Sequence, residues 1–355
     1  MTWRILRRLA WSAFVVWATV TIAFLVESAL PSDPARMIAG AQARPQDVAR
    51  IRRDMGFHCS IFVQYARFAG RLVHLEPEAD GTAAAAGLIA GDPDDAQCLA
   101  SRRQVTHTTC ATFGPIHIDL GRSYQQRRAV TTILAERFPR TFFLAICAAL
   151  VQALLGVTAG VLAAAKKRTR LDFAAVAASL LGVSAPTFVI GIFFQWLFAH
   201  RLRVLPLDGY GDTTAEHFAC VILPALTLGI FGAAYYTRMV RDEMIVELGQ
   251  DYVRTARAKG LSGAAVVVRH ALRNALMPIV TIFGLELGGL VGGAIVTEAL
   301  FRWPGIGALS VQSLLDRDGP IVMGCVILTS GAVVLSNLLV DVAYTFLDPR
   351  LRRDG

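Results

Sequence analysis

The residues of this chain that are best suited to chemistry fall into three groups. Arg254, Arg257 and Lys259 give positive charge to a short polar segment, residues 251–260, between two apolar stretches. Glu286 lies alone in an apolar stretch that is rich in glycine. Three cysteines and four histidines share residues 31–137: Cys59, Cys98, Cys110, His58, His74, His107 and His117. These types could provide a charged docking surface, a buried polar contact, and a disulfide bond or a metal site.

The sequence does not indicate an enzyme. Its only lysines are Lys166, Lys167 and Lys259, and none precedes a serine or threonine, so the chain has no Walker A phosphate loop. The seven histidines are scattered, without a nucleophile–base pattern, and no compact ligand spacing favours a metal site. We therefore expect no catalytic residue, no metal and no cofactor in this chain.

Composition predicts the elements that position these groups. Hydrophobic residues make up 54% of the 355 residues and charged residues 17%, with a mean hydropathy of +0.50. Soluble domains are about 45–50% apolar and about 25% charged. Six apolar stretches are each long enough to cross a bilayer as a helix: residues 9–30, 141–165, 173–199, 218–236, 276–296 and 321–346. The prediction is an all-α integral membrane protein with six transmembrane helices, kinked at Pro186 and Pro224. It disfavours a soluble enzyme, a disordered scaffold, a coiled coil and a nucleic-acid-binding domain.

Positive charge predicts the orientation of these helices. Lysine and arginine are concentrated before the first stretch, between the second and third, between the fourth and fifth, and after the sixth. The positive-inside rule places these segments and both termini in the cytoplasm. The first stretch is expected to be an uncleaved anchor, because it is long and no small-residue cleavage pattern follows it.

The expected organisation has four parts. Residues 1–30 form the N-terminal cytoplasmic end and the first helix, and residues 31–137 form a long extracytoplasmic cap loop. Within that loop, residues from about 76 to 110 are polar and rich in alanine and glycine, so we interpret them as an insertion. Residues 138–347 form a five-helix core, and residues 348–355 a cytoplasmic tail.

The basic segment is predicted to form a short helix with defined ends. Asp251 is a helix N-cap type, good helix formers follow, and Gly260 can end the helix with a positive φ. A second helix, which carries Arg269, His270 and Arg273, then re-enters the membrane near Pro278. A plain positive-inside loop is the alternative, but the order of cap, helix, glycine stop, return helix and proline favours a built element.

The same segment resembles a known family. Residues 251–261 read Asp-Tyr-Val-Arg-Thr-Ala-Arg-Ala-Lys-Gly-Leu, which is typical of the membrane permeases of ATP-binding-cassette (ABC) importers, in the dipeptide/oligopeptide/nickel branch. The broader family pattern is Glu-Ala-Ala followed by three residues and a glycine; when it is aligned on Gly260, Ala256 is the only match to Glu-Ala-Ala. Further matches are Leu-Gly-Arg-Ser at residues 120–123, Phe-Arg-Trp-Pro-Gly at 301–305 and Leu-Asp-Pro-Arg at 347–350.

The resemblance implies a type I ABC importer permease fold and a role in transport. The permease would form half of a translocation pathway for dipeptides or oligopeptides, in the bacterial cytoplasmic (inner) membrane. Its partners would be a homologous second permease, two ATP-binding subunits that hold ATP and magnesium, and an extracytoplasmic substrate-binding protein, without nucleic acid. The short helix would couple to the ATP-binding subunits through Asp251, Tyr252, Arg254, Thr255, Ala256, Arg257, Ala258, Lys259 and Gly260.

Other functions remain open alternatives at this point. The same machinery could carry nickel or another small solute. A secondary transporter is disfavoured, because the two halves of the chain show no internal repeat.

Two site hypotheses remain outside the short helix. Glu286 could line the pathway or form a structural hydrogen bond to a neighbouring helix. Cys98 and Cys110 are the closest cysteines of the loop in sequence, so we expect a disulfide between them and a free thiol at Cys59, although three single pairings are possible. The insertion is expected to modulate docking of the binding protein and not to line the pathway.

Overall fold

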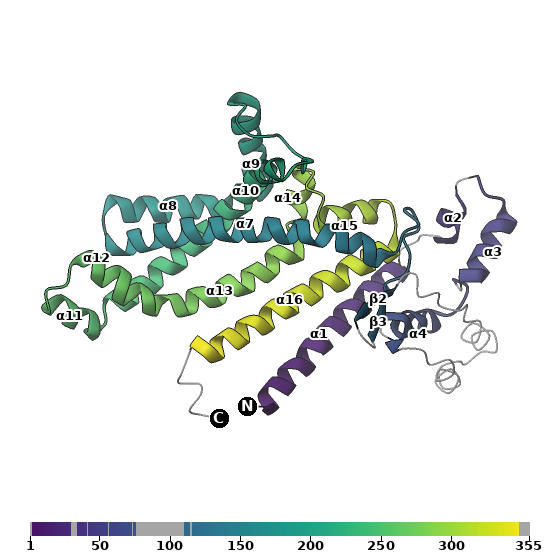
Figure 1. The fold of residues 1–355 in the computed structure, drawn as a ribbon, viewed down its shortest axis with the longest axis horizontal. Helices are drawn as coiled ribbons and strands as arrows, with labels where there is room; N and C mark the ends of the chain where they lie inside the picture. The colour runs from purple at the N-terminus through teal and green to yellow at the C-terminus, as the bar shows by residue number, and fades with distance from the viewer. Residues whose placement is uncertain are drawn as a thin grey trace. The chain divides into compact units, whose positions relative to one another are not determined.

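A computed structural model describes residues 2–29, 34–40, 42–55, 57–72, 74–75, 110–113 and 116–347 (Figure 1). Residues 76–109, which make up nearly all of the expected insertion, lie outside the described residues. So does the expected tail at residues 348–355. The rest forms two compact units, which are described separately. One unit consists of the described residues of 1–6, 137–308 and 329–355, and the other consists of the described residues of 7–136 and 309–328.

The second unit contains most of the first helix, the described part of residues 31–136, and residues 309–328. Its elements are α1 (Thr2–Ala29), α2 (Pro34–Ala39), α3 (Pro45–Met55), α4 (Ile61–Leu72), β1 (His74–Leu75), β2 (Cys110–Phe113) and β3 (Ile116–Asp119). The strands form an antiparallel sheet in the order β1-β3-β2, with His117 opposite both His74 and Thr112. This small sheet is the one addition to the predicted all-α chain within the described residues.

The first unit is a helical core. Its elements, some of which extend into the other unit, are α7 (Val130–Ala165), α8 (Arg170–Ser184), α9 (Thr187–Phe194), the π-helix η2 (Gln195–Arg201), α10 (Thr214–Leu248), α11 (Asp251–Ala258), α12 (Gly263–Ala265), the π-helix η3 (Val266–Ala271), α13 (Leu272–Gly293), α14 (Ile295–Leu300), α15 (Ile306–Leu315) and α16 (Gly319–Leu347). Long α10 packs on α8, α9, α13 and α14. Figure 1 shows α11 and α12 at one end of the layer that α7, α8, α10 and α13 form.

The described residues contain six candidate membrane spans if each bent helix pair counts as one. Four single helices are long and apolar enough to cross a bilayer: Ala10–Ser28, Val130–Ala165, Thr214–Leu248 and Gly319–Val340. The two bent pairs are Arg170–Ser184 with Thr187–Arg201, at 101°, and Gly263–Leu276 with Pro278–Val291, at 52°. Each of the six predicted stretches overlaps one of these spans, so the six-helix prediction is confirmed.

The two prolines within the predicted spans act differently. Ala185 and Pro186 are both extended, with ψ of 125° and 138°, so the predicted kink at Pro186 is a complete break between α8 and α9. Pro224 lies inside α10, which continues from Thr214 to Leu248. Pro224 is ten residues after the start of α10, and its missing N–H removes one helical hydrogen bond without ending the helix.

Small residues let the core helices approach closely. A Cβ at Gly156 of α7 would lie 2.4 Å from the Cβ of Tyr236, and one at Gly160 would lie 2.7 Å from that of Val240, both on α10. Ala271 and Ala275 of the return helix join the same buried cluster. The helices on both sides of α11 are therefore packed into one core, as membrane helices with small-residue interfaces are.

Candidate functional site

The short helix α11 begins one residue earlier than it would if Asp251 were its N-cap. Gln250 is the N-cap, with φ −69° and ψ 154°, and its side chain makes no capping hydrogen bond. Asp251, predicted to be the cap, is instead the first helical residue. Its carboxylate thus lies at the positive end of the helix dipole, where negative charge is favourable.

The end of α11 confirms the predicted glycine stop. Gly260 has φ +78°. Its N–H donates to the carbonyl of Arg257 at 2.9 Å, and the N–H of Leu261 donates to the carbonyl of Ala256 at 3.4 Å. These two bonds form a Schellman motif, in which the residue with positive φ is usually glycine. A Cβ at Gly260 would meet no atom within 4 Å, so the backbone angle alone demands glycine here.

One face of α11 is attached to the rest of the chain. Val253 and Ala256 are buried against Val266 of η3, with Leu248 packed partly against the same cluster. Ala256 was expected among the residues that contact a partner, but its side chain faces its own chain. It lies three residues after Val253, on the same side of the helix, so it serves to anchor α11.

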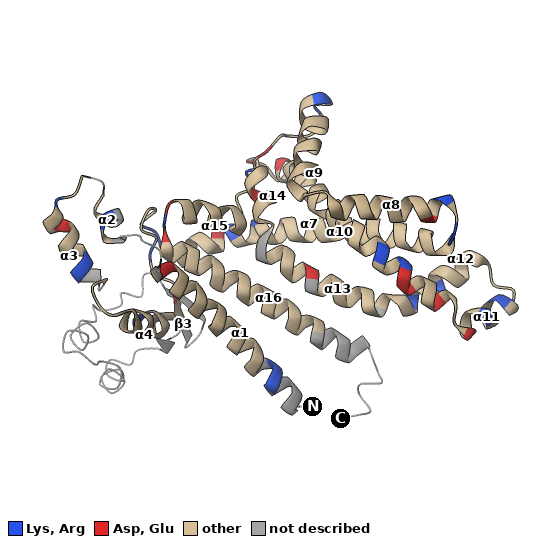
Figure 2. Cartoon of the chain, turned by 180° about the vertical axis from the view of Figure 1, so that it is seen from behind, with Lys and Arg blue, Asp and Glu red and all other residues tan. Residues whose placement is uncertain are grey.

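The other face of α11 is exposed and cationic. The remaining expected coupling residues are all exposed: Asp251, Tyr252, Arg254, Thr255, Arg257, Ala258, Lys259 and Gly260. Arg254 pairs with Asp251 at 3.4 Å, and Tyr252 donates a hydrogen bond to Glu247 at 2.5 Å. Arg257 and Lys259 form no ion pair with any residue in the described part of the chain. Figure 2 shows the mixed charge of α11.

The chain returns to the core through a segment that is partly π-helical. Ser262 caps α12 by accepting a hydrogen bond from the N–H of Ala265 at 3.4 Å. Residues 266–271 then form η3, and α13 continues through Pro278, where the axis bends. The predicted return helix is confirmed. Its π-helical start could not be predicted, because π-helices are rare and have no local sequence signal.

Glu286 forms a hydrogen bond to a neighbouring helix. The Nε2 of Gln152 on α7 donates to its Oε2 at 2.9 Å, and Gln152 is 1% exposed. A Cβ at Gly232 would lie 2.0 Å from the Oε1 of Gln152, so this glycine leaves room for the amide. The buried hydroxyl of Tyr236 lies beside the pair but has no hydrogen-bond partner of good geometry among the described residues. Gln152 thus provides the structural hydrogen bond that was one of the two alternatives for Glu286. The other alternative, that Glu286 lines the pathway, stays a prediction.

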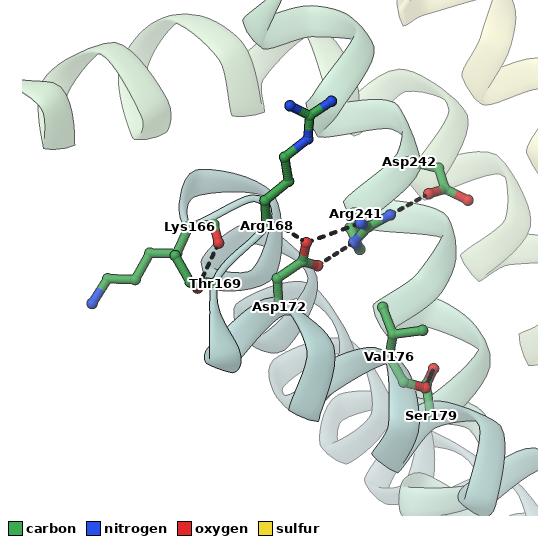
Figure 3. Close-up of polar contacts among 8 residues, drawn as sticks. All are labelled: Lys166, Arg168, Thr169, Asp172, Val176, Ser179, Arg241 and Asp242. Atoms are coloured by element: carbon green, nitrogen blue, oxygen red, sulfur yellow. Dashed lines mark hydrogen bonds and ion pairs between the residues drawn. The ribbon is translucent and has the colours of Figure 1, made fainter.

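Asp172 and Arg241 form an ion pair that the sequence did not indicate (Figure 3). The guanidinium of Arg241 on α10 donates to both carboxylate oxygens of Asp172 on α8, at 2.5 and 3.1 Å. The backbone N–H of Arg168 donates to the same carboxylate at 2.9 Å. Because 69 residues separate the partners, no local pattern could have found the pair.

Glu298 on α14 was also missed, although an acid among apolar residues is a visible signal. Its side chain is fully buried. Oε1 accepts from the hydroxyl of Thr141 at 2.8 Å, and Oε2 accepts from the N–H of Ala308 at 2.9 Å. Burial raises the pKa of Glu298 despite these bonds. A Cβ at Gly305 would lie 2.5 Å from the carboxylate, so the glycine of the Phe-Arg-Trp-Pro-Gly motif leaves room for it.

The cysteine pairing differs from the prediction. Cys59, expected to be a free thiol, is in a disulfide bond. The expectation of a free thiol at Cys59 is therefore wrong. The side chains of the expected Cys98–Cys110 pair lie outside the described part of the chain, and Cys59 itself is buried beside Val63.

Two family comparisons agree with this architecture. Residues 156–353 match the family described as the binding-protein-dependent transport system inner membrane component, and residues 1–88 match its N-terminal counterpart. The chain belongs to this family. It is therefore a multi-pass membrane subunit of an ABC transport system, a permease and not itself an enzyme. Membership also implies a substrate-binding protein and an ATPase as partners.

Relatives of this permease match along its whole length. The probable D,D-dipeptide transport system permease protein DdpB of Escherichia coli (strain K12) is 33% identical, covering 99% of this chain and 98% of its own. A probable peptide ABC transporter permease protein, y4tP of Sinorhizobium fredii, is 36% identical, and the glutathione transport system permease protein GsiC of Salmonella paratyphi A is 33% identical. Each of these two alignments covers 98% of both chains.

A solved structure has the same fold as this permease. A chain of the inward-facing MetNI methionine ABC transporter aligns with a TM-score of 0.53, covering 61% of this chain and 97% of that one, at 17% identity. The type I ABC importer permease fold is therefore confirmed.

Proposed function

We propose that this permease forms half of the translocation pathway of an ATP-driven peptide importer. The full-length relatives support the substrate class, since their names refer to D,D-dipeptide, peptide and glutathione transport. A homologous second permease would form the other half. The pairs Gln152–Glu286 and Asp172–Arg241 would keep the core helices together while the halves move against each other.

The geometry of α11 carries the coupling proposal. Val253 and Ala256 attach the helix to η3, whereas the Schellman motif at Gly260 turns the chain sharply back toward α13. A force applied to the exposed cationic face would therefore reach α10 and α13 through short, rigid connections. We infer that this face docks in a groove of the ATP-binding subunit, which holds ATP and magnesium.

The proposed orientation follows the distribution of charge. The turn between α7 and α8 and the segment around α11 both carry exposed cations, which the positive-inside rule assigns to the cytoplasm together with both termini. The 31–137 segment then lies outside the bacterial inner membrane, on the side where a binding protein delivers substrate.

Charge reversal tests the docking surface. The doubly substituted chain Arg257→Glu, Lys259→Glu should insert normally but co-purify with the ATP-binding subunits at least about tenfold less well, since mutating exposed interface charges weakens association. Arg203→Glu is the control, because Arg203 is exposed but far from α11 in sequence and outside the proposed surface. Equal co-purification of all three chains would show that α11 does not dock there.

Reconstitution tests the transported class. The complete importer in proteoliposomes should hydrolyse ATP faster with the binding protein and a dipeptide than with nickel. Accumulation of peptide without the ATP-binding subunits, driven by an ion gradient, would instead establish a secondary transporter. Stimulation of ATP hydrolysis by nickel and not by the dipeptide would support an ATP-driven importer but contradict a peptide substrate.

A further inference from the structure

The turn between α7 and α8 concentrates positive charge that has no ion-pair partner among the described residues. Residues 166–170 are Lys-Lys-Arg-Thr-Arg, and all five are exposed. None of the four cationic side chains forms an ion pair with a residue that the structure describes. Figure 2 shows lysine and arginine at this turn. A positive-inside signal needs such charge but does not need a shaped site around it.

The nearby acid, Asp172, forms its ion pair with Arg241 and not with any of these cations. Asp172 is committed to Arg241, whose guanidinium contacts both of its oxygens, and it also accepts the backbone N–H of Arg168. That bond helps hold Arg168 at a φ of +64°, which is uncommon for a residue with a side chain. Figure 3 shows the Arg168 and Lys166 side chains pointing away from the Asp172–Arg241 pair. The ion pair thus shapes the turn and leaves its positive charge available.

A hollow and an apolar margin adjoin the turn. The hollow has a volume of about 340 Å³ and is lined by Arg168, Thr169, Asp172, Phe173, Val176 and Arg241. Small-molecule sites begin at a volume of about 300 Å³. The side chains of Leu171 and Phe173 are 57% and 77% exposed immediately after the cations. Because α7 ends and α8 begins here, the turn lies where two membrane helices reach the bilayer surface.

We propose that this turn binds the phosphate headgroup of an anionic phospholipid in the adjacent leaflet. The cations of residues 166–170 would contact the phosphate, and Phe173 and Leu171 would contact the upper part of the acyl chains. Basic pockets between membrane helices on the cytoplasmic side suit acidic headgroups. A free phosphate ion would satisfy the cations but would leave the two exposed apolar side chains without a partner. The proposal rests on α7 and α8 crossing the membrane and is independent of the role of α11.

Lipid titration with a matched control tests the site. Short-chain phosphatidylglycerol is added to the purified full-length permease in neutral detergent, and bound lipid is counted by native mass spectrometry against phosphatidylcholine. Arg168→Gln, Arg170→Gln should weaken phosphatidylglycerol binding about 25-fold, at about fivefold per cation. The control, Arg201→Gln, Arg203→Gln, also removes two exposed positive charges and should change nothing. Equal binding of the two lipids, or equal loss in both variants, would overturn the proposal.

Further arms separate the possible ligands. Phe173→Ser keeps every charge and should weaken phosphatidylglycerol binding severalfold without altering its dependence on salt, and unchanged affinity would contradict the assigned acyl contact. Displacement of the lipid by millimolar inorganic phosphate would identify a soluble anion as the ligand and would contradict the lipid proposal. If Arg168→Gln, Arg170→Gln no longer co-purifies with the ATP-binding subunits but binds lipid as before, the turn is a protein contact, and the lipid proposal is overturned.

Discussion

Replacing Gly260 with valine isolates the backbone requirement at the end of α11. The substitution adds a β-branched side chain at φ +78°, in the left-handed region, where an L-residue costs roughly 1–2 kcal/mol and a branched one the upper value or more. A Cβ there meets no atom within 4 Å, so the penalty contains no steric clash with the rest of the chain. We therefore assign about 2 kcal/mol of strain to the Schellman motif.

This strain is comparable to the contact that holds α11 in place. Burying Val253 fully contributes about 1.5–3 kcal/mol, so the strained end should open while the helix keeps part of its anchor. About 2 kcal/mol corresponds to a roughly 30-fold larger open population. Insertion should be unaffected, because the substitution lies outside the membrane spans, whereas transport should uncouple from ATP hydrolysis.

Hydrogen exchange of the full chain in nanodiscs measures the opening directly. Peptides covering residues 251–261 should exchange about 30-fold faster in Gly260→Val. Gly263→Val is the matched control, because Gly263 also has no atom near its Cβ position but has no positive φ. Gly260→Asn should lie between, since asparagine tolerates the left-handed region. Exchange in Gly260→Val as slow as in the unsubstituted chain would refute the reasoning.

Three further predictions follow from the polar contacts of the core and from the disulfide. Burial raises the pKa of Glu298 above its ordinary value of 4.5, so its contribution to the free energy of unfolding should be lost as the pH rises above that value. Glu298→Gln should therefore flatten the dependence of Tm on pH. Parallel profiles of Tm against pH for the two chains would contradict this. A double-mutant cycle of Asp172→Asn and Arg241→Gln should give a coupling of about 0.5–3 kcal/mol by thermal unfolding, and strict additivity would show that the pair contributes nothing. Peptide mapping without reduction should find Cys59 crosslinked, and reduction should destabilise its unit by about 2–4 kcal/mol; a free Cys59 thiol would rule this out.

The sequence by itself determined the features that depend on neighbours along the chain. Apolar runs of sufficient length located the six spans, because each membrane helix satisfies its own backbone hydrogen bonds. The order of polar, helical and glycine residues located α11. Because glycine has no Cβ and tolerates a positive φ, Gly260 could be predicted as the residue that ends the helix. These patterns involve residues that are close in sequence, so they can be recognised without knowledge of the fold.

Only the tertiary structure decided which distant side chains meet. Gln152 and Glu286 are 134 residues apart, and Thr141 and Glu298 are 157 residues apart. Neither pair has a spacing that a helix period could reveal, because each depends on which helix faces pack together. The same reason explains the disulfide at Cys59 and the burial of Ala256, whose small side chain suits an exposed position and an anchored one equally well. Only the packing of η3 beneath α11 distinguishes the two.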